Sequence, residues 1–148
     1  MIVWGGADDI SNFTNTGGRY CAQGGPTPTP TPTPTPAPVV VNVSVSTSTV
    51  AEGGSAIYTV HAKPAPTQNT TVNYSMSGTA TQGTDYILNG TPGQVTIAAG
   101  KTAGKVKLKA TIDHVTEDTE TAIMTLQPGS GYTVGPKNQG TISITDSP

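Results

Sequence analysis

The chain has 148 residues, of which 11% are charged, and it contains 27 Thr, 18 Gly and 13 Pro but one Trp and one Phe. This composition is poor in helix formers and in large apolar side chains, which excludes a helical bundle and two separate hydrophobic cores. The net charge is −2 and the isoelectric point is about 5.5, so we expect no nucleic acid partner, because such partners usually require a clustered basic face.

Residues 1–25 show no hydrophobic periodicity and are rich in Gly, Asn and Thr. The apolar run at Met1–Trp4 is short and has no basic flank, so we expect neither a signal peptide nor a membrane span. Such a segment cannot bury enough surface to fold alone, and two interpretations are open: a disordered tail, or an arm that becomes ordered on a partner. In the second interpretation, which we favour, the partner-binding anchors are Trp4, Phe13, Tyr20 and the single cysteine, Cys21.

Residues 26–38 have proline at every second position, interleaved with threonine and one alanine. Proline fixes φ and lacks an N–H group, so this stretch is expected to form an extended polyproline II linker of about 3.1 Å per residue. The linker predicts a boundary between the arm and a folded domain at 39–148.

From residue 39 onward, apolar and polar residues alternate with period two between segments that contain Gly, Pro and Asn, which predicts β-strands. Seven short strands at this spacing are typical of an all-β, antiparallel β-sandwich. The predicted strands are Val39–Val45, Ala56–His61, Val72–Met76, Gln94–Ala98, Lys105–Thr111, Thr121–Leu126 and Gly140–Thr145.

The fifth predicted strand alternates lysine with Val106, Leu108 and Ala110, so Lys105, Lys107 and Lys109 are expected on its solvent face. A solvated row that discourages pairing at a sheet edge is the simplest interpretation, and a contact surface is the other.

If each strand runs antiparallel to the one before, every second connection lies at the same end of the sandwich. One end then receives seven acidic side chains from four separate segments. These are Glu52, Asp85, Asp113, Glu117, Asp118, Glu120 and Asp146. The other end receives Lys63, Lys101 and Lys137, so we expect an electrically polarised domain.

Four segments of the chain resemble the Calx-beta domain, in the right order and at suitable spacing over residues 39–148. They read Ala-Glu-Gly-Gly at 51–54, Gly-Thr-Ala-Thr-Gln-Gly-Thr-Asp-Tyr at 78–86, Asp-His-Val-Thr-Glu-Asp-Thr-Glu-Thr at 113–121 and Ile-Ser-Ile-Thr-Asp at 142–146. The resemblance implies an immunoglobulin-like β-sandwich that often binds calcium at one pole. It also implies a set of metal ligands, Glu52, Asp85, Asp113, Glu117 and Asp146, with Glu120 as a common family acid of less certain role.

Two departures from the family pattern reduce the acidic set. Ile112 precedes Asp113 where the family often has paired aspartates, and the chain ends Asp146-Ser147-Pro148 where an acidic cluster is common. Calcium takes six to eight oxygens, so we expect one or two ions bound weakly, with dissociation constants on the order of 10⁻⁴ to 10⁻³ M. The alternative is a degenerate pole whose carboxylates are solvated or cap turns.

No arrangement typical of an enzyme is present in the sequence. His61 and His114 stand alone, without a serine or cysteine in a nucleophile context, and no glycine-rich loop opens a helix. We therefore expect a protein that is not an enzyme.

The three parts of the chain together favour a structural or adhesive display module, in which an arm docks on a larger assembly and a stalk holds the β-sandwich away from it. The assembly would be a virion, as for a decoration or head-fibre protein, or a filament or cell surface, and the location virion surface or extracellular. The start at Met1 without a signal peptide favours the virion. A surface glycan or a receptor stays open as a further partner. The alternatives are a calcium-responsive regulatory domain and an accessory binding module of a secreted multidomain enzyme.

Overall fold

In the computed structural model, the described part of the chain is residues 37–146. The arm 1–25, its anchors Trp4, Phe13, Tyr20 and Cys21, and most of the linker 26–38 lie outside these residues. The described part folds into ten β-strands: β1 Val40–Val45, β2 Thr49–Ala51, β3 Ser55–Lys63, β4 Thr70–Ser77, β5 Tyr86–Leu88, β6 Gln94–Ile97, β7 Ala103–Ala110, β8 Glu120–Leu126, β9 Thr133–Val134 and β10 Gln139–Thr145. Within residues 37–146, no helix is long and apolar enough to cross a membrane.

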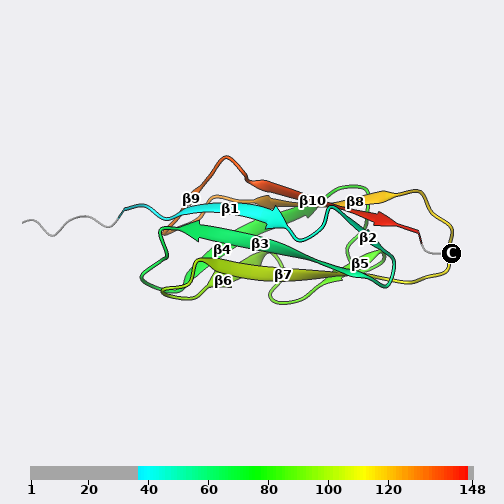
Figure 1. The fold of residues 1–148 in the computed structure, drawn as a ribbon, viewed down its shortest axis with the longest axis horizontal. Helices are drawn as coiled ribbons and strands as arrows, with labels where there is room; N and C mark the ends of the chain where they lie inside the picture. Colours follow the sequence, from blue (N-terminus) through cyan, green and yellow to red (C-terminus); the bar gives the residue numbers. More distant parts are fainter. Residues whose placement is uncertain (1–36, 147–148) are drawn as a thin grey trace, which may run out of the picture. The chain divides into compact units, whose positions relative to one another are not determined.

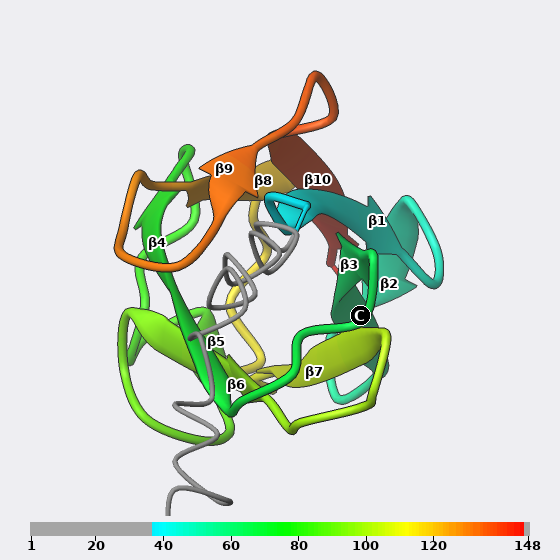
Figure 2. The ribbon, with the colours of Figure 1, turned by 90° about the vertical axis from the view of Figure 1, so that its left-hand side faces the viewer.

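The strands form two sheets of five, which confirms the predicted all-β sandwich. One sheet has the order β5-β7-β3-β1-β9 and the other the order β2-β10-β8-β4-β6. The strands follow the long direction of the domain in Figure 1, and Figure 2 shows the two sheets from one end, curled around the interior. The β3–β4 and β6–β7 connections lie at one end of the domain and the β2–β3, β4–β5 and β7–β8 connections at the other, whereas the β5–β6 connection lies along its side.

The core lies between the sheets and is built from alternate residues of each strand, as period two requires. On β3, Ala56, Tyr58 and Val60 are buried, and Leu108 of β7 is fully buried beside them. The Tyr58 hydroxyl donates a hydrogen bond of 2.7 Å to the Ala122 carbonyl on β8, so a buried polar contact joins the two sheets. Each large buried apolar side chain contributes about 1.5–3 kcal/mol to stability.

The prediction of seven strands was wrong, because the structure has three more. β2, β5 and β9 contain three, three and two residues, which is too few to show an alternating pattern. They form through pairing with longer neighbours: β5 with β7, β2 with β10 and β9 with β1. The β2–β10 and β1–β9 pairs are parallel, so the sandwich is not wholly antiparallel.

The first two strands belong to different sheets, and the chain changes sheets at residues 46–48. Ser46 fixes this crossing, since its N–H donates to the Ile57 carbonyl and its hydroxyl accepts from the Ile57 N–H, both at 2.9 Å. After the crossing, β2 pairs with β10 near the end of the chain. This places Glu52, which directly follows β2, close to the end of β10.

Candidate metal centre

Four segments gather at the end of the sandwich where β10 finishes. They are the connections β2–β3, β4–β5 and β7–β8 and the end of β10, and Figure 1 shows them around the C-terminal end of the described chain. They carry the seven acidic residues that we call the acidic pole: Glu52, Asp85, Asp113, Glu117, Asp118, Glu120 and Asp146.

Backbone hydrogen bonds hold these segments together. The Glu52 N–H donates to the Thr145 carbonyl at 3.0 Å, which joins the β2–β3 connection to β10. The Thr111 N–H donates to the Asp85 carbonyl at 2.9 Å, which joins β4–β5 to β7–β8. The acidic pole is therefore assembled by the fold and does not depend on side-chain contacts alone.

Three carboxylates of the acidic pole converge. Asp85, Glu117 and Glu120 each place one oxygen so that the three oxygens lie within 4.8 Å of one another. They come from the end of the β4–β5 connection, the β7–β8 connection and the first position of β8. Because calcium holds its oxygens at about 2.3–2.6 Å, ligands around one ion are separated by distances of this order.

Asp85 is fixed by its own turn. Its Oδ2 accepts a hydrogen bond of 2.6 Å from the Thr81 N–H, and its N–H donates to the Thr81 carbonyl at 3.0 Å. Gly83 lies between them with φ +99°, a left-handed conformation that glycine adopts without steric cost. The Gly-Thr-Asp sequence at 83–85 thus positions one carboxylate at the acidic pole.

Glu52 carries a carboxylate oxygen whose hydrogen-bonding capacity is not satisfied by the described residues. Its Oε2 is buried and has no hydrogen-bond partner among the described residues. A buried acceptor that stays unpaired costs free energy, and a bound cation or an ordered water would satisfy it. Burial, followed by the charges of Asp113 and Asp146, raises the pKa of the Glu52 carboxyl.

Two further glutamates have perturbed acidity for the same reasons. Partial desolvation, followed by the charges of Asp113 and Asp85, raises the pKa of the exposed Glu117. Burial, followed by a hydrogen bond to Asp85 and its charge, raises the pKa of Glu120. Without a cation, the acidic pole therefore holds more negative charge than its surroundings stabilise.

The predicted ligands divide into two groups. Asp85 and Glu117 belong to the converging set, whereas Glu52, Asp113 and Asp146 lie around it, near enough to act on it electrostatically. One carboxylate oxygen of Asp113 is already engaged within the same loop, because its Oδ1 accepts a hydrogen bond of 2.9 Å from the Val115 N–H. The intervening His114 has φ 61°.

Glu120 is the site residue that sequence reasoning undervalued. The period-two pattern placed the strand start at Thr121, whereas β8 begins at Glu120, which pairs with Ile144. The spacing Glu117-x-x-Glu120 directly before a strand was the available signal. Asp118, between them, is exposed and outside the converging set.

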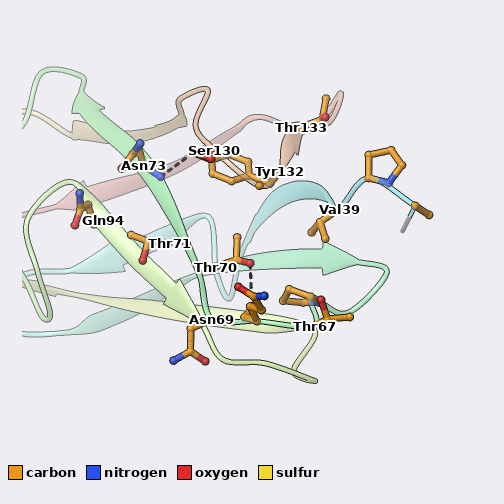
Figure 3. Close-up of a pocket in the computed structure, with 15 residues that line it drawn as sticks. Val39, Thr67, Asn69, Thr70, Thr71, Asn73, Gln94, Ser130, Tyr132 and Thr133 are labelled. Atoms are coloured by element: carbon orange, nitrogen blue, oxygen red, sulfur yellow. Dashed lines mark hydrogen bonds between the residues drawn. The ribbon is translucent and has the colours of Figure 1, made fainter. Parts of the chain in front are cut away.

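A cavity of about 830 Å³ lies at the opposite end of the domain (Figure 3). Its lining includes Thr70, Asn73 and Tyr132, and it carries no charged side chain. The Tyr132 hydroxyl accepts from the Asn73 N–H at 3.0 Å and donates to the Gln127 carbonyl at 2.7 Å, which fixes the ring. This lining offers no carboxylate to a metal, so the acidic pole is the candidate metal centre.

Comparison with known proteins agrees with this architecture. Residues 36–148 match the model of the Calx-beta domain family. Among solved structures, the apo-form Calx CBD1 domain has a TM-score of 0.62 and 22% identity, with 76% of this chain and 100% of that chain covered. CBD12 from CALX1.2 has a TM-score of 0.60 and 22% identity, with coverage of 72% and 45%.

The calcium binding domain CBD12 of CALX1.1 has a TM-score of 0.59 and 23% identity, with coverage of 74% of this chain and 44% of that chain. The match thus spans less than half the length of the two longer structures. No curated protein is similar enough to this chain to give a match. At these identities, the structural likeness establishes the fold.

Proposed function

Because this chain belongs to the Calx-beta domain family, we propose that its β-sandwich is a non-catalytic module that binds calcium at the acidic pole. The observation that carries the proposal is the convergence of Asp85, Glu117 and Glu120 to within 4.8 Å. The unpartnered, buried Oε2 of Glu52 is independent support, since it is an acceptor without a donor.

The residues present fit a hard cation that prefers oxygen. Carboxylates and backbone carbonyls are calcium's usual ligands, and the acidic pole offers seven carboxyl groups without a cysteine. Asp85, Glu117 and Glu120 would hold the ion, and Glu52, Asp113 and Asp146 would add ligands or balance its charge. These carboxylates are enough to coordinate one or two calcium ions.

Calcium would act on stability and stiffness. The β7–β8 connection, residues 111–119, has no regular secondary structure and carries Asp113 and Glu117. An ion shared between this connection, Asp85 and Glu120 would restrain it against two other elements. Binding to the folded state alone stabilises that state by mass action.

The wider role that we propose is display. The described chain enters β1 at the end that carries the uncharged cavity, so the acidic pole lies at the far end from the linker junction. In this proposal, linker 26–38 and arm 1–25 tether the module to a larger assembly, a virion, filament or cell surface, with Trp4, Phe13, Tyr20 and Cys21 as anchors. The module is then a structural or adhesive unit outside the cell or on the virion.

Calorimetric titration tests the calcium proposal. The parent chain should bind calcium with a dissociation constant on the order of 10⁻⁴ to 10⁻³ M, and an Asp85→Ala and Glu117→Ala double variant should lose binding. An Asp118→Asn variant is the matched control, because Asp118 is acidic but outside the converging set. Absence of both heat and thermal shift in the parent would refute calcium binding.

Deletion of residues 1–25 tests the display proposal separately. The truncated chain should fold and bind calcium like the parent but fail to co-sediment with the native particles, filaments or cell envelopes. Unchanged co-sedimentation would remove the anchoring role and leave the calcium proposal intact.

A further inference from the structure

The outward face of the sheet β5-β7-β3-β1-β9 carries a line of cations. On β7, exposed lysines alternate with buried residues, so three ammonium groups project to the same side. On the neighbouring β3, the exposed residues of the same alternation end at Lys63. We call these four residues the basic stripe: Lys63, Lys105, Lys107 and Lys109.

The basic stripe follows most of the length of the domain. The register pairs Lys109 with Ser55 and Lys105 with Thr59, and Lys63 lies four residues beyond Thr59 on the same face of β3. Two residues along a strand advance about 6.8 Å, so the stripe covers four such steps, or about 27 Å. Figure 1 shows β3 and β7 side by side along this direction.

No carboxylate on these strands offsets the charge. The residues opposite the three β7 lysines are Ser55, Ile57 and Thr59, and the outward residues of β1 beyond them include Asn42 and Ser44. The seven acids of the described part all belong to the acidic pole, which lies at one end of the domain. The face is therefore positively charged although the chain as a whole carries −2.

Protection of a sheet edge accounts for only part of the basic stripe. Edge strands commonly carry lysine to prevent pairing with other chains, and β7 is an edge at 103–106, because β5 pairs with it only at 108–110. Lys109 lies in the part that β5 covers, and Lys63 is on β3, which lies between β7 and β1. Like charges at every second position of one strand repel one another, and an external anion would offset this repulsion over the whole stripe.

The polar and aliphatic side chains beside the basic stripe indicate which class of anion it binds. Ser44 Oγ and His61 Nε2 lie 2.8 Å apart on the same face, and Thr59 adds a hydroxyl, so polar groups accompany the charges. Ile87, opposite Lys109, is 54% exposed and offers an aliphatic surface. A sugar chain presents this combination of hydroxyls, acidic groups and C–H surfaces.

Other polyanions fit less well. Single-stranded nucleic acids are held by stacking on aromatic rings, whereas Tyr58 and Tyr86, the aromatic residues of these strands, are buried. A peptide added as a strand needs an open sheet edge, which β7 offers only at 103–106, away from Lys109 and Lys63.

We propose that the basic stripe binds a linear polysaccharide that carries carboxylate or sulfate groups. The polymer lies along β7 and β3, with its acidic groups near the ammonium groups and its hydroxyls near Thr59 and His61. This surface is separate from the acidic pole and does not depend on calcium binding.

Binding of the full chain to immobilised polymers in calcium-free buffer tests this proposal. Polygalacturonate supplies carboxylates and dextran sulfate supplies sulfates, while neutral dextran and single-stranded DNA are the comparisons. The chain should bind one or both acidic polysaccharides saturably and neutral dextran not at all. Binding should weaken as salt rises from 50 to 200 mM, because the contact is electrostatic.

Two variants with the same change in charge locate the surface. K107Q removes one charge from the basic stripe, and K137Q removes one from an exposed lysine outside it. The first should weaken binding at least about threefold and the second less than about 1.5-fold, because only the first lowers the charge of the stripe. Equal weakening by both variants, or tighter binding to single-stranded DNA than to either acidic polysaccharide, would overturn the proposal.

Discussion

Glu120→Gln should stabilise the calcium-free protein and weaken its binding of calcium. Glu120 is the first residue of β8, and one of its oxygens lies within 4.8 Å of oxygens of Asp85 and Glu117. Without calcium, the substitution removes one of three negative charges that repel one another. With calcium, it removes a charged ligand.

The expected size follows from these distances. Two unit charges 4.8 Å apart repel by about 0.9 kcal/mol in water, and salt screening reduces this to roughly 0.5 kcal/mol. With two neighbouring carboxylates, the free energy of unfolding of the calcium-free protein should rise by about 1 kcal/mol for the Glu120 substitution. A domain of this size then gains roughly 4 °C in Tm.

Calcium should remove this advantage. At 10 mM calcium and a dissociation constant of 0.1–1 mM, the parent gains about 1.4–2.7 kcal/mol by mass action. Loss of one charged ligand should weaken binding about tenfold, which reduces the variant's gain to roughly 0.4–1.4 kcal/mol. The two proteins should therefore have nearly equal stability at 10 mM calcium.

Urea unfolding with and without calcium measures both effects, with Asp118→Asn as the matched control. Asp118 is acidic and two positions from Glu120 but lies outside the converging set, so its substitution should change neither quantity by more than about 0.5 kcal/mol. Destabilisation of the calcium-free protein by Glu120→Gln, or an unchanged calcium response, would refute the assigned role of Glu120.

Three further predictions concern acidity and packing. In calcium-free buffer the free energy of unfolding should fall as pH rises above 4.5, the ordinary glutamate pKa, because desolvation and neighbouring carboxylates raise the pKa of Glu52, Glu117 and Glu120 in the folded state. The folded state then binds protons more tightly than the unfolded state, and a rise in stability as these groups ionise, measured by urea unfolding, would contradict the assignment. Tyr58→Phe should cost about 1–2 kcal/mol in the same assay, because it removes the buried hydrogen bond to the Ala122 carbonyl, and a cost near zero would mean that this bond does not help to join the sheets. Gly78→Ala should lower Tm far more than Gly83→Ala. Both glycines have positive φ, but a Cβ at Gly78 would meet the Thr121 carbonyl, whereas a Cβ at Gly83 has open space. Equal losses of Tm would contradict the close approach of the Thr121 carbonyl to Gly78.

The long strands could be predicted from sequence because their alternation is a property of the residues themselves. β3 and β7 show this best, since every second residue of each is buried. The short strands β2 and β9 could not be predicted, because they exist through parallel pairing with β10 and β1. Pairing between distant segments leaves no local pattern in two or three residues.

The candidate site was predictable as a region but not as a set of ligands. Alternating strand direction was enough to place the segments of Glu52, Asp85 and Glu117 at one end. Which carboxylates converge depends on the backbone of residues 111–119, where Asp113 accepts a hydrogen bond within its own turn. The start of β8 at Glu120 depends on its pairing with Ile144 in β10.

Calcium should bind at the acidic pole and at no other part of the sandwich. Backbone amide chemical shifts, recorded by NMR during a calcium titration of the full chain, test this binding site most directly. Saturable shifts are expected for the amides at 52–54, 81–86, 111–120 and 145–146, with little change around the opposite cavity at 67–71 and 130–133. Absence of shifts at the pole in 10 mM calcium, or shifts that centre on the opposite end, would contradict it.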